Sequence, residues 1–233
     1  EENPFLGGRG IRISLDHPEI FLVQIRALLR ASEGLNNLKI MLPMISNISE
    51  LDAALALIHR AYRELTEEEN YNLKLPPLGA MIEVPAAVYQ VKEIGSRVDF
   101  MSVGTNDLTQ YLLAVDRNNP RVAEIYDSLH PSVLRALKSI QEQAVSVDCE
   151  LSVCGEMAGD PVSAVVLMGL GYKNLSMSAS SLLRVKSLML KVSREMAEDW
   201  VDEALCLSDA ASVGRYMSEA LAPYTFKQSK LAS

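Results

Sequence analysis

The sequence predicts an α/β protein built on a parallel β-sheet. Short apolar runs alternate with longer segments whose apolar residues recur at helical spacing, which is the pattern of successive β–α–β units. The apolar runs carry few polar residues, as expected for strands that are covered on both faces. The chain has 233 residues, 48% of them hydrophobic, which is enough for one sizeable core.

Five strands and several helices are expected. The strands are the mostly apolar runs at 38–43, 78–85, 99–107, 150–156 and 174–179. Helical patterns cover 17–32, 47–65, 131–147 and 160–171, and a helical tail is expected from about 184 to near the end of the chain. Ser49 is the expected cap of the second helix, and Asp160 with Pro161 marks the start of the fourth.

Composition excludes several classes of protein. The formal charge of −8 argues against a nucleic-acid binder, which needs clustered Lys and Arg. No apolar run approaches the roughly 18 residues that span a bilayer, and the opening EENPFLGGRG is not a signal peptide. Three cysteines in a chain of this length make no disulfide framework. A cytoplasmic protein without membrane partners is expected.

Polar side chains cluster at the carboxyl ends of the expected strands. They are Glu83, Asn106, Asp107, Cys154 and Glu156. In a parallel barrel these strand ends converge on one face, and that face carries the active site. The alternative is that polar residues simply begin the loops that follow most strands.

Two of these residues are candidate metal ligands. Glu83 lies within an apolar run, where a carboxylate is costly to bury unless it is paired or binds a cation. Together with Asp107 from the next strand it could ligate Mg²⁺, which accepts a couple of carboxylates plus water and substrate oxygens. The alternatives are a buried salt bridge from Glu83 to an arginine, and a role for Asp107 as the cap of the helix that follows.

Arginines near glycines or strand ends are candidate phosphate ligands. Arg117 follows Asp107 by ten residues, and its planar guanidinium can bind two oxygens at once. Its alternative is an ion pair with Asp116. Arg9 and Arg12 flank glycines that let backbone approach a ligand, although composition alone favours a surface loop leading into a helix.

Cys154 is a candidate proton donor. It lies at a strand end beside Gly155, and a thiol with a pKa of about 8.5 can donate a proton at neutral pH. A buried cysteine is more often a small apolar residue, and this is the expectation for Cys149 and Cys206. The three histidines lack the spacing of a zinc site.

Several stretches together resemble one family. They are NPFLGGRGIRIS, LKIMLPMI, MIEVPAA, VDFMSVGTNDLTQYLLAVDRNN, LHPSVLRAL, CGEMAGDP and NLSMSA, in order from about Asn3 to Arg194. They are similar to the phosphoenolpyruvate-binding barrel of enzyme I, the phosphoenolpyruvate–protein phosphotransferase of the bacterial phosphotransferase system. Stretches such as GRGIRISLDHPEIF are most similar to its nitrogen-related branch.

The resemblance implies a role for each matching position. Glu83 and Asp107 are the implied Mg²⁺ ligands, and Asn106, Asp107 and Arg117 the implied contacts to phosphoenolpyruvate. Arg9 would help to hold the phosphate. Cys154 would be the acid that protonates the enolpyruvate carbon and so yields pyruvate. The chain departs from the family at Gly8, where a tryptophan is usual.

The resemblance also implies a larger assembly. The barrel would be a (β/α)8 barrel that is incomplete here, because three strands carrying two further arginines would lie upstream of Glu1. We therefore expect weak or no turnover by this chain alone. The implied partners are a phosphohistidine domain of the same protein, a small phosphocarrier protein and a second copy of the chain as a homodimer. The rival interpretations are a pyruvate phosphate dikinase or phosphoenolpyruvate synthase domain and a non-catalytic interaction module.

Overall fold

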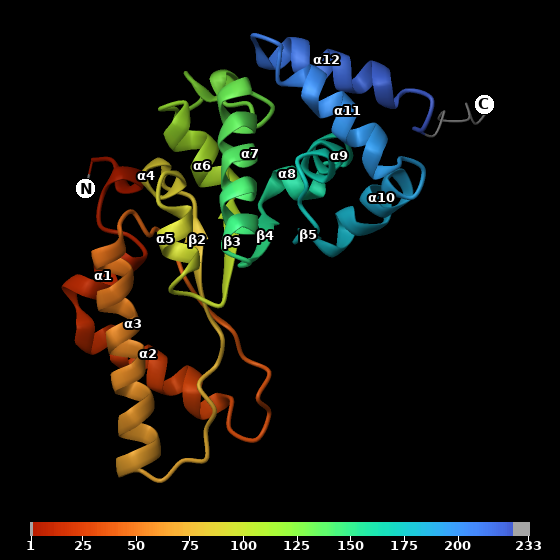
Figure 1. The fold of residues 1–233 in the computed structure, drawn as a ribbon. Coiled ribbons are helices and arrows are strands. Elements are labelled where there is room, and N and C mark those ends of the chain that lie inside the picture. The colour runs from red at the N-terminus through yellow and green to blue at the C-terminus, as the bar shows by residue number, and fades with distance from the viewer. Residues whose placement is uncertain (1, 226–233) are drawn as a thin grey trace, which may run out of the picture.

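The computed structural model describes residues 2–225, and its centre is one sheet of five parallel strands in chain order. The strands are β1 (Ile40–Leu42), β2 (Leu78–Ile82), β3 (Phe100–Gly104), β4 (Glu150–Cys154) and β5 (Asn174–Leu175). Figure 1 shows an open sheet, with α1 to α3 at the β1 side and α10 to α12 at the β5 side. The α/β class and the five parallel strands are confirmed, and the sheet is not closed into a barrel.

Helices follow each strand and cover the sheet. They are α1 (Ile11–Asp16), α2 (Pro18–Ala31), α3 (Ile48–Arg63), α4 (Pro85–Val88), α5 (Val91–Gly95), α6 (Thr105–Leu112), α7 (Pro131–Ser146), α8 (Glu156–Gly159), α9 (Pro161–Gly169), α10 (Ala179–Met189), α11 (Arg194–Ala204) and α12 (Ala210–Leu221). Short helical turns occur at Pro4–Leu6, Glu64–Glu68 and Ala123–Ile125. The last part of the expected helical tail, 226–233, lies outside the described residues.

The two faces of the sheet differ in polarity. Met101 and Val103 of β3 point to the helix side and are fully buried. Ser102, between them, points to the other face, where it is in register with Met81 and Ser152 of the neighbouring strands. At the β1 edge of that face Met41 is 37% exposed. The helix side is therefore the core, and the opposite side is a partly open surface that ends at the strand tips.

The strands are shorter than the apolar runs suggested, and for β2 and β3 the reason is that a helix begins soon after the strand. Pro85 is the first residue of α4, so β2 ends before Glu83. Thr105 is the first residue of α6, so β3 ends at Gly104. Glu83 and the residues after Gly104 are consequently held at the ends of strands by short, well-defined turns.

The expected helix cap Ser49 is wrong, and so is the alternative role of Asp107 as a cap. Asn47, not Ser49, caps α3: its side chain accepts from the backbone N–H of Glu50, whose carboxylate reaches back to the Asn47 N–H in a capping box. Asp107 does not cap α6, because the helix begins two residues earlier and Asp107 lies in its first turn. Asp160 does cap α9 as expected, accepting from the Ser163 N–H at 2.8 Å.

None of the helices described between residues 2 and 225 is both long and apolar enough to cross a bilayer.

Candidate active site

The strand tips bring Glu83 and Cys154 together across a glycine. Gly104 ends β3 and is in register with Cys154, which ends β4. A Cβ atom on Gly104 would stand 2.7 Å from Oε2 of Glu83, so no other residue fits here without moving the carboxylate. The glycine therefore leaves room for the Glu83 side chain beside the end of β3. The expected convergence of these strand ends is present.

Glu83 is a buried carboxylate that forms no ion pair with any residue described between 2 and 225. Its side chain accepts the backbone N–H of Met44 at 2.7 Å, and the residue is only 4% exposed. Met44 has a φ of +60°, a strained conformation for methionine that turns its N–H toward the acid. Burial raises the pKa of Glu83 to about 7, against the lowering effect of the Met44 N–H, and the nearby charge of Asp107 adds to the rise. The expected alternative, a salt bridge from Glu83 to arginine, is not formed among the described residues.

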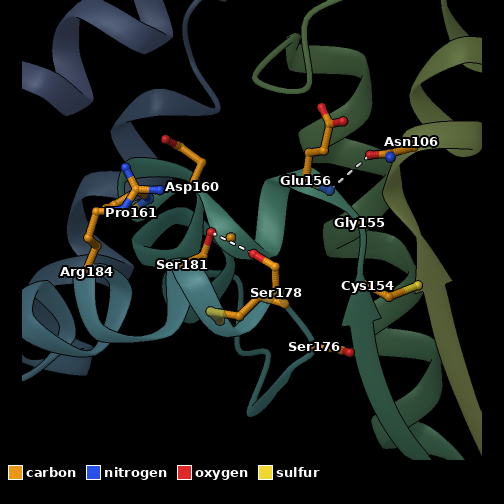
Figure 2. Close-up of a pocket in the computed structure, with 12 residues that line it drawn as sticks. Asn106, Cys154, Gly155, Glu156, Asp160, Pro161, Ser176, Ser178, Ser181 and Arg184 are labelled. Carbon is orange, nitrogen blue, oxygen red and sulfur yellow. Dashed lines mark hydrogen bonds between the residues drawn. The ribbon is translucent and has the colours of Figure 1, made fainter.

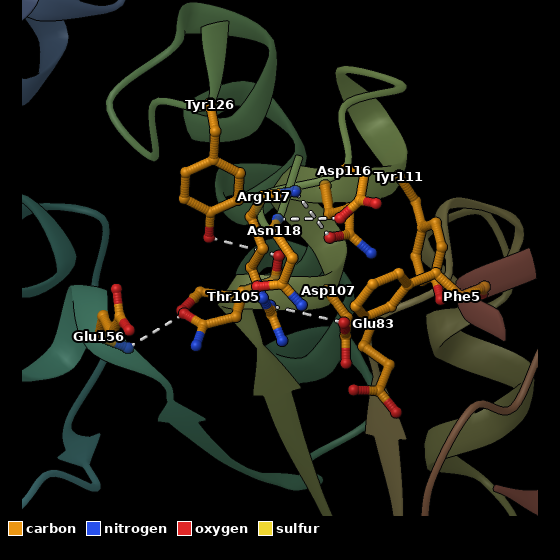
Figure 3. A network of polar contacts seen from close by, with 12 residues as sticks. Phe5, Glu83, Thr105, Asp107, Tyr111, Asp116, Arg117, Asn118, Tyr126 and Glu156 are labelled. Carbon is orange, nitrogen blue, oxygen red and sulfur yellow. Dashed lines mark hydrogen bonds and ion pairs between the residues drawn. The ribbon is translucent and has the colours of Figure 1, made fainter. Parts of the chain in front are cut away.

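Asp107 lies between two arginines. Nη2 of Arg9 is 3.3 Å from Oδ2, and Nη1 of Arg117 is 3.5 Å from Oδ1. The contact to Arg117 lacks hydrogen-bond geometry, which leaves Oδ1 and Nη1 buried without a hydrogen bond. Figure 3 shows Asp107 beside Glu83 and Arg117. Arg117 thus pairs with Asp107 and not with Asp116, the alternative that the sequence suggested.

Only one of the two loop arginines reaches this site. Arg9 donates from Nη1 to the Tyr111 hydroxyl at 3.3 Å, and its guanidinium lies 5.3 Å from the centre of the Phe5 ring. The Tyr111 hydroxyl in turn donates to the Phe5 carbonyl. Arg12 instead donates to the carbonyls of Leu6 and Gly7 and so ties down the loop.

Asn106 is oriented by the turn after β4. Its Oδ1 accepts the backbone N–H of Glu156 at 3.1 Å, which leaves the amide hydrogens free to donate elsewhere. Gly155 makes this approach feasible, because its φ is +107° and a Cβ there would stand 2.4 Å from Oγ1 of Thr105. Tyr126 donates to the Asn106 carbonyl at 3.3 Å. Glu156 contributes its backbone N–H, while its side chain is exposed.

Cys154 is half-buried beside the end of β3. Its Sγ lies 3.4 Å from the Val103 carbonyl, and burial raises the pKa of the thiol above its usual value. The residue lines a cavity of about 580 Å³ that also touches Asn106, Glu156, Ser176 and Arg184, as Figure 2 shows.

The other two cysteines lie away from this cavity. Cys149 is half-buried, with a thiol pKa also raised by burial, and contacts the Val98 carbonyl. Cys206 is exposed, so the expectation that it is a buried apolar residue is wrong.

Several residues of the site were not anticipated. They are Phe5, Thr109, Gln110, Tyr111 and Tyr126. Tyr111 follows Asp107 by one helical turn, a spacing that could have indicated that both face the same side of α6. Thr109 and Gln110 are buried, and Oγ1 of Thr109 and Nε2 of Gln110 have no hydrogen bond. Oε1 of Gln110 accepts the backbone N–H of Arg117. Phe5 and Tyr126 lie in loops, where no periodic pattern indicates direction.

The two carboxylates fit a divalent cation. Asp107 Oδ1 is buried without a hydrogen bond, and the burial of Glu83 and its repulsion from Asp107 raise the Glu83 pKa. A cation between them would relieve both effects. Across residues 2–225 no group of three or more His, Cys, Asp or Glu is arranged to hold a metal. A cation here would therefore take its other ligands from water and substrate, as Mg²⁺ commonly does.

At the carboxyl ends of the strands this open parallel sheet brings together two acids and a thiol, and two arginines from loops contact one of the acids. The family of PEP-utilising enzymes matches this chain through its PEP-binding domain over residues 1–194. The chain belongs to that family.

Individual relatives agree with this assignment. A protein of Salmonella typhimurium named phosphoenolpyruvate-dependent phosphotransferase system is 55% identical over 85% of this chain and 26% of its own length. The Escherichia coli protein of the same name is 53% identical over 88% and 27%. A phosphoenolpyruvate-protein phosphotransferase of Cupriavidus necator is 45% identical over 87% and 34%. The chain thus spans about a quarter to a third of the length of these relatives.

A solved structure supports the fold independently. The crystal structure of a citrate lyase from Burkholderia xenovorans superposes with a TM-score of 0.57, covering 90% of this chain and 69% of that one. The two sequences are 18% identical, so the likeness concerns the fold alone.

Proposed function

We propose that this chain is the phosphoenolpyruvate-binding part of a Mg²⁺-dependent phosphoenolpyruvate–protein phosphotransferase. The observation that carries the proposal is the meeting of Glu83, Asp107 and Cys154 at the strand tips, with Arg9 and Arg117 at Asp107. Phosphoryl transfer depends on positioning and charge neutralisation, and this set of residues supplies both. The names of the relatives point to the same reaction.

Each residue has a role in binding. Glu83 and Asp107 hold Mg²⁺, which when bound neutralises negative charge on the substrate. Arg9 and Arg117 bind the phosphoryl oxygens through their N–H donors, whose contacts to Asp107 are long, at 3.3 and 3.5 Å. Asn106 donates its free amide hydrogens to a substrate oxygen, because its Oδ1 is already engaged by Glu156.

Cys154 completes the reaction as an acid. The phosphoryl group leaves the enol oxygen of phosphoenolpyruvate for a histidine nitrogen of another domain, and the oxygen keeps the bonding electrons. The enolate carbon then takes the thiol proton of Cys154, which gives pyruvate and a thiolate that solvent reprotonates. Burial raises the pKa of the Cys154 thiol, which favours the protonated form that donates in this step.

The phosphoryl acceptor is not among the histidines of this chain. His130 accepts the backbone N–H of Ser132 at the start of α7, and His17 lies beside Glu19 on an exposed surface. The acceptor belongs to a separate phosphohistidine domain, from which a small phosphocarrier protein takes the group. The parent protein is cytoplasmic, forms a homodimer and is of the nitrogen-related branch. Alone, with an open sheet, this chain turns over weakly or not at all.

Ligand-dependent thermal protection tests the proposal. We expect Mg²⁺ together with phosphoenolpyruvate or oxalate to raise the melting temperature of the full gene product, and either component alone to do much less. The variant Glu150→Gln is the control. It should show the same protection as the wild type, because Glu150 lies exposed at the opposite end of the sheet. Protection that is independent of Mg²⁺, or absent altogether, would contradict the proposal and favour a non-catalytic module. A nucleotide requirement would favour a dikinase or synthase.

A further inference from the structure

One aromatic ring lies against both arginines of the site. The guanidinium carbon of Arg9 is 5.3 Å from the centre of the Phe5 ring, and that of Arg117 is 6.0 Å from it. Both distances are within the range of cation–π attraction. Phe5 is half-buried and lies next to Asp107 and Tyr111 in Figure 3. Both guanidiniums also contact Asp107, so the two cations lie near the same carboxylate and near each other.

This closeness needs a cause, because like charges repel. Arginine side chains carry about 2 kcal/mol of rotamer entropy each, so two unrestrained guanidiniums would separate into solvent. Asp107 attracts both, but its contacts are long, at 3.3 and 3.5 Å. If Asp107 also holds Mg²⁺, as proposed above, the cation competes with the arginines for that carboxylate. The ring of Phe5 still contacts both guanidiniums in that case, whereas the Tyr111 hydroxyl holds Arg9.

A ring and a carboxylate hold arginine in different ways. A carboxylate occupies N–H donors of the guanidinium, whereas the face of an aromatic ring attracts the cation without accepting those hydrogen bonds. Arginines held by Phe5 therefore keep donors for another anion. That anion must approach from the side of the site, where Asp107 already contacts both guanidiniums.

The ring is fixed to the helix that carries Asp107. Phe5 lies in the short turn Pro4–Leu6, and its carbonyl accepts from the Tyr111 hydroxyl of α6. The same hydroxyl accepts from Arg9. Arg12 holds the next two carbonyls of the loop. The loop, the ring and the first arginine are thus tied to one face of α6.

We propose that Phe5 is a positioning residue, whose ring holds Arg9 and Arg117 side by side so that both guanidiniums meet the phosphoryl group of the substrate. The inference rests on the proposed function, because it takes the phosphoryl group to be the anion bound there. Phe5 acts through the two arginines and does not itself contact the substrate.

Phe5→Leu in the full gene product tests this role. With Mg²⁺ present, we expect the Kd for phosphoenolpyruvate to rise about tenfold, as two lost cation–π contacts imply. The Kd for oxalate, which has no phosphoryl group, should change less than twofold. Phe5→Tyr should retain wild-type affinity because it keeps the ring. Leu6→Ala is the matched control, since Leu6 is exposed in the same turn.

A double-mutant cycle with Arg9→Ala separates positioning from general packing. Because Phe5 then has only Arg117 to hold, the penalty of Phe5→Leu should fall to about threefold. Equal weakening of phosphoenolpyruvate and oxalate by Phe5→Leu, or an unchanged tenfold penalty in the Arg9→Ala background, would overturn the role of Phe5. Wild-type protein that binds neither ligand would instead overturn the proposed function, and this inference with it.

Discussion

The two ends of the parallel sheet treat acidic side chains differently. At the amino end, Glu150 is exposed and pairs with Lys39 at 3.3 Å, and Asp99 is exposed and accepts the Leu78 N–H at 2.8 Å. At the carboxyl end, Glu83 is 4% exposed and Asp107 has an oxygen without a hydrogen bond. Glu150 and Asp99 are exposed and hydrogen-bonded, whereas Glu83 is buried and Asp107 is largely buried and incompletely paired.

This difference separates acids that support the fold from acids that are available for binding. A fold gains little from burying two carboxylates near each other, because desolvation and mutual repulsion both act against it. Such groups persist where a ligand completes them. The contrast therefore favours the carboxyl end as the place where a cation and an anionic substrate bind.

The largest expected effect concerns the thiol. Cys154→Ala in the full gene product should lower pyruvate formation by about 10²- to 10⁴-fold, the usual contribution of a positioned acid. Affinity for phosphoenolpyruvate with Mg²⁺ should change little, since the thiol contacts a backbone carbonyl and not the arginines. Stopped-flow assay of pyruvate and calorimetric titration measure the two quantities. Cys206→Ala is the control, and equal turnover in both variants would remove Cys154 from the mechanism.

The next effect is a pH dependence of stability caused by Glu83. Its pKa in the folded protein, about 7, lies above the ordinary value of 4.5, so the folded state keeps a proton that the unfolded state has lost. Stability should therefore fall as pH rises from about 4.5 to 7, by about 3 kcal/mol for this group. Urea titrations of wild type and Glu83→Gln measure it. If the free energy of unfolding changed with pH as little in the wild type as in Glu83→Gln, Glu83 would not be a buried carboxyl that titrates in this range.

The smallest effect compares two glycines. Gly104→Ala places a methyl group 2.7 Å from the Glu83 carboxylate and should cost about 1–3 kcal/mol of folding free energy, as overpacking does. Gly214→Ala, in α12, meets no atom nearer than 3.8 Å and should stabilise the protein by about 0.5–1 kcal/mol. Chemical denaturation of the two variants measures the difference. Equal stabilities would mean that Gly104 does not make room for the acid.

The sequence predicted the sheet better than the details of the site. Five apolar runs separated by helical patterns were sufficient to locate the five parallel strands, because periodicity reports burial directly. The gathering of Glu83, Asp107 and Cys154 followed from their positions at strand ends. Cap assignments failed at Ser49 because Asn47 and Glu50 form a stronger reciprocal pair than the serine offers.

The partners of the arginines could not be predicted in the same way. The ion pair of Arg117 with Asp107 depends on the path of the chain between them, which no local pattern specifies. Phe5 reaches the site from a loop about a hundred residues away in sequence, through the bond of its carbonyl to Tyr111. Loop direction is set by such long-range contacts rather than by hydrophobic period.

Binding of Mn²⁺ as a substitute for Mg²⁺ tests most directly whether Glu83 and Asp107 share one divalent ion. Electron paramagnetic resonance of the full gene product with oxalate should show one bound Mn²⁺ in the wild type and in Glu150→Gln. The affinity of the protein for Mn²⁺ should fall at least a hundredfold in both Glu83→Gln and Asp107→Asn. Wild-type affinity in either of those two variants would contradict the shared site.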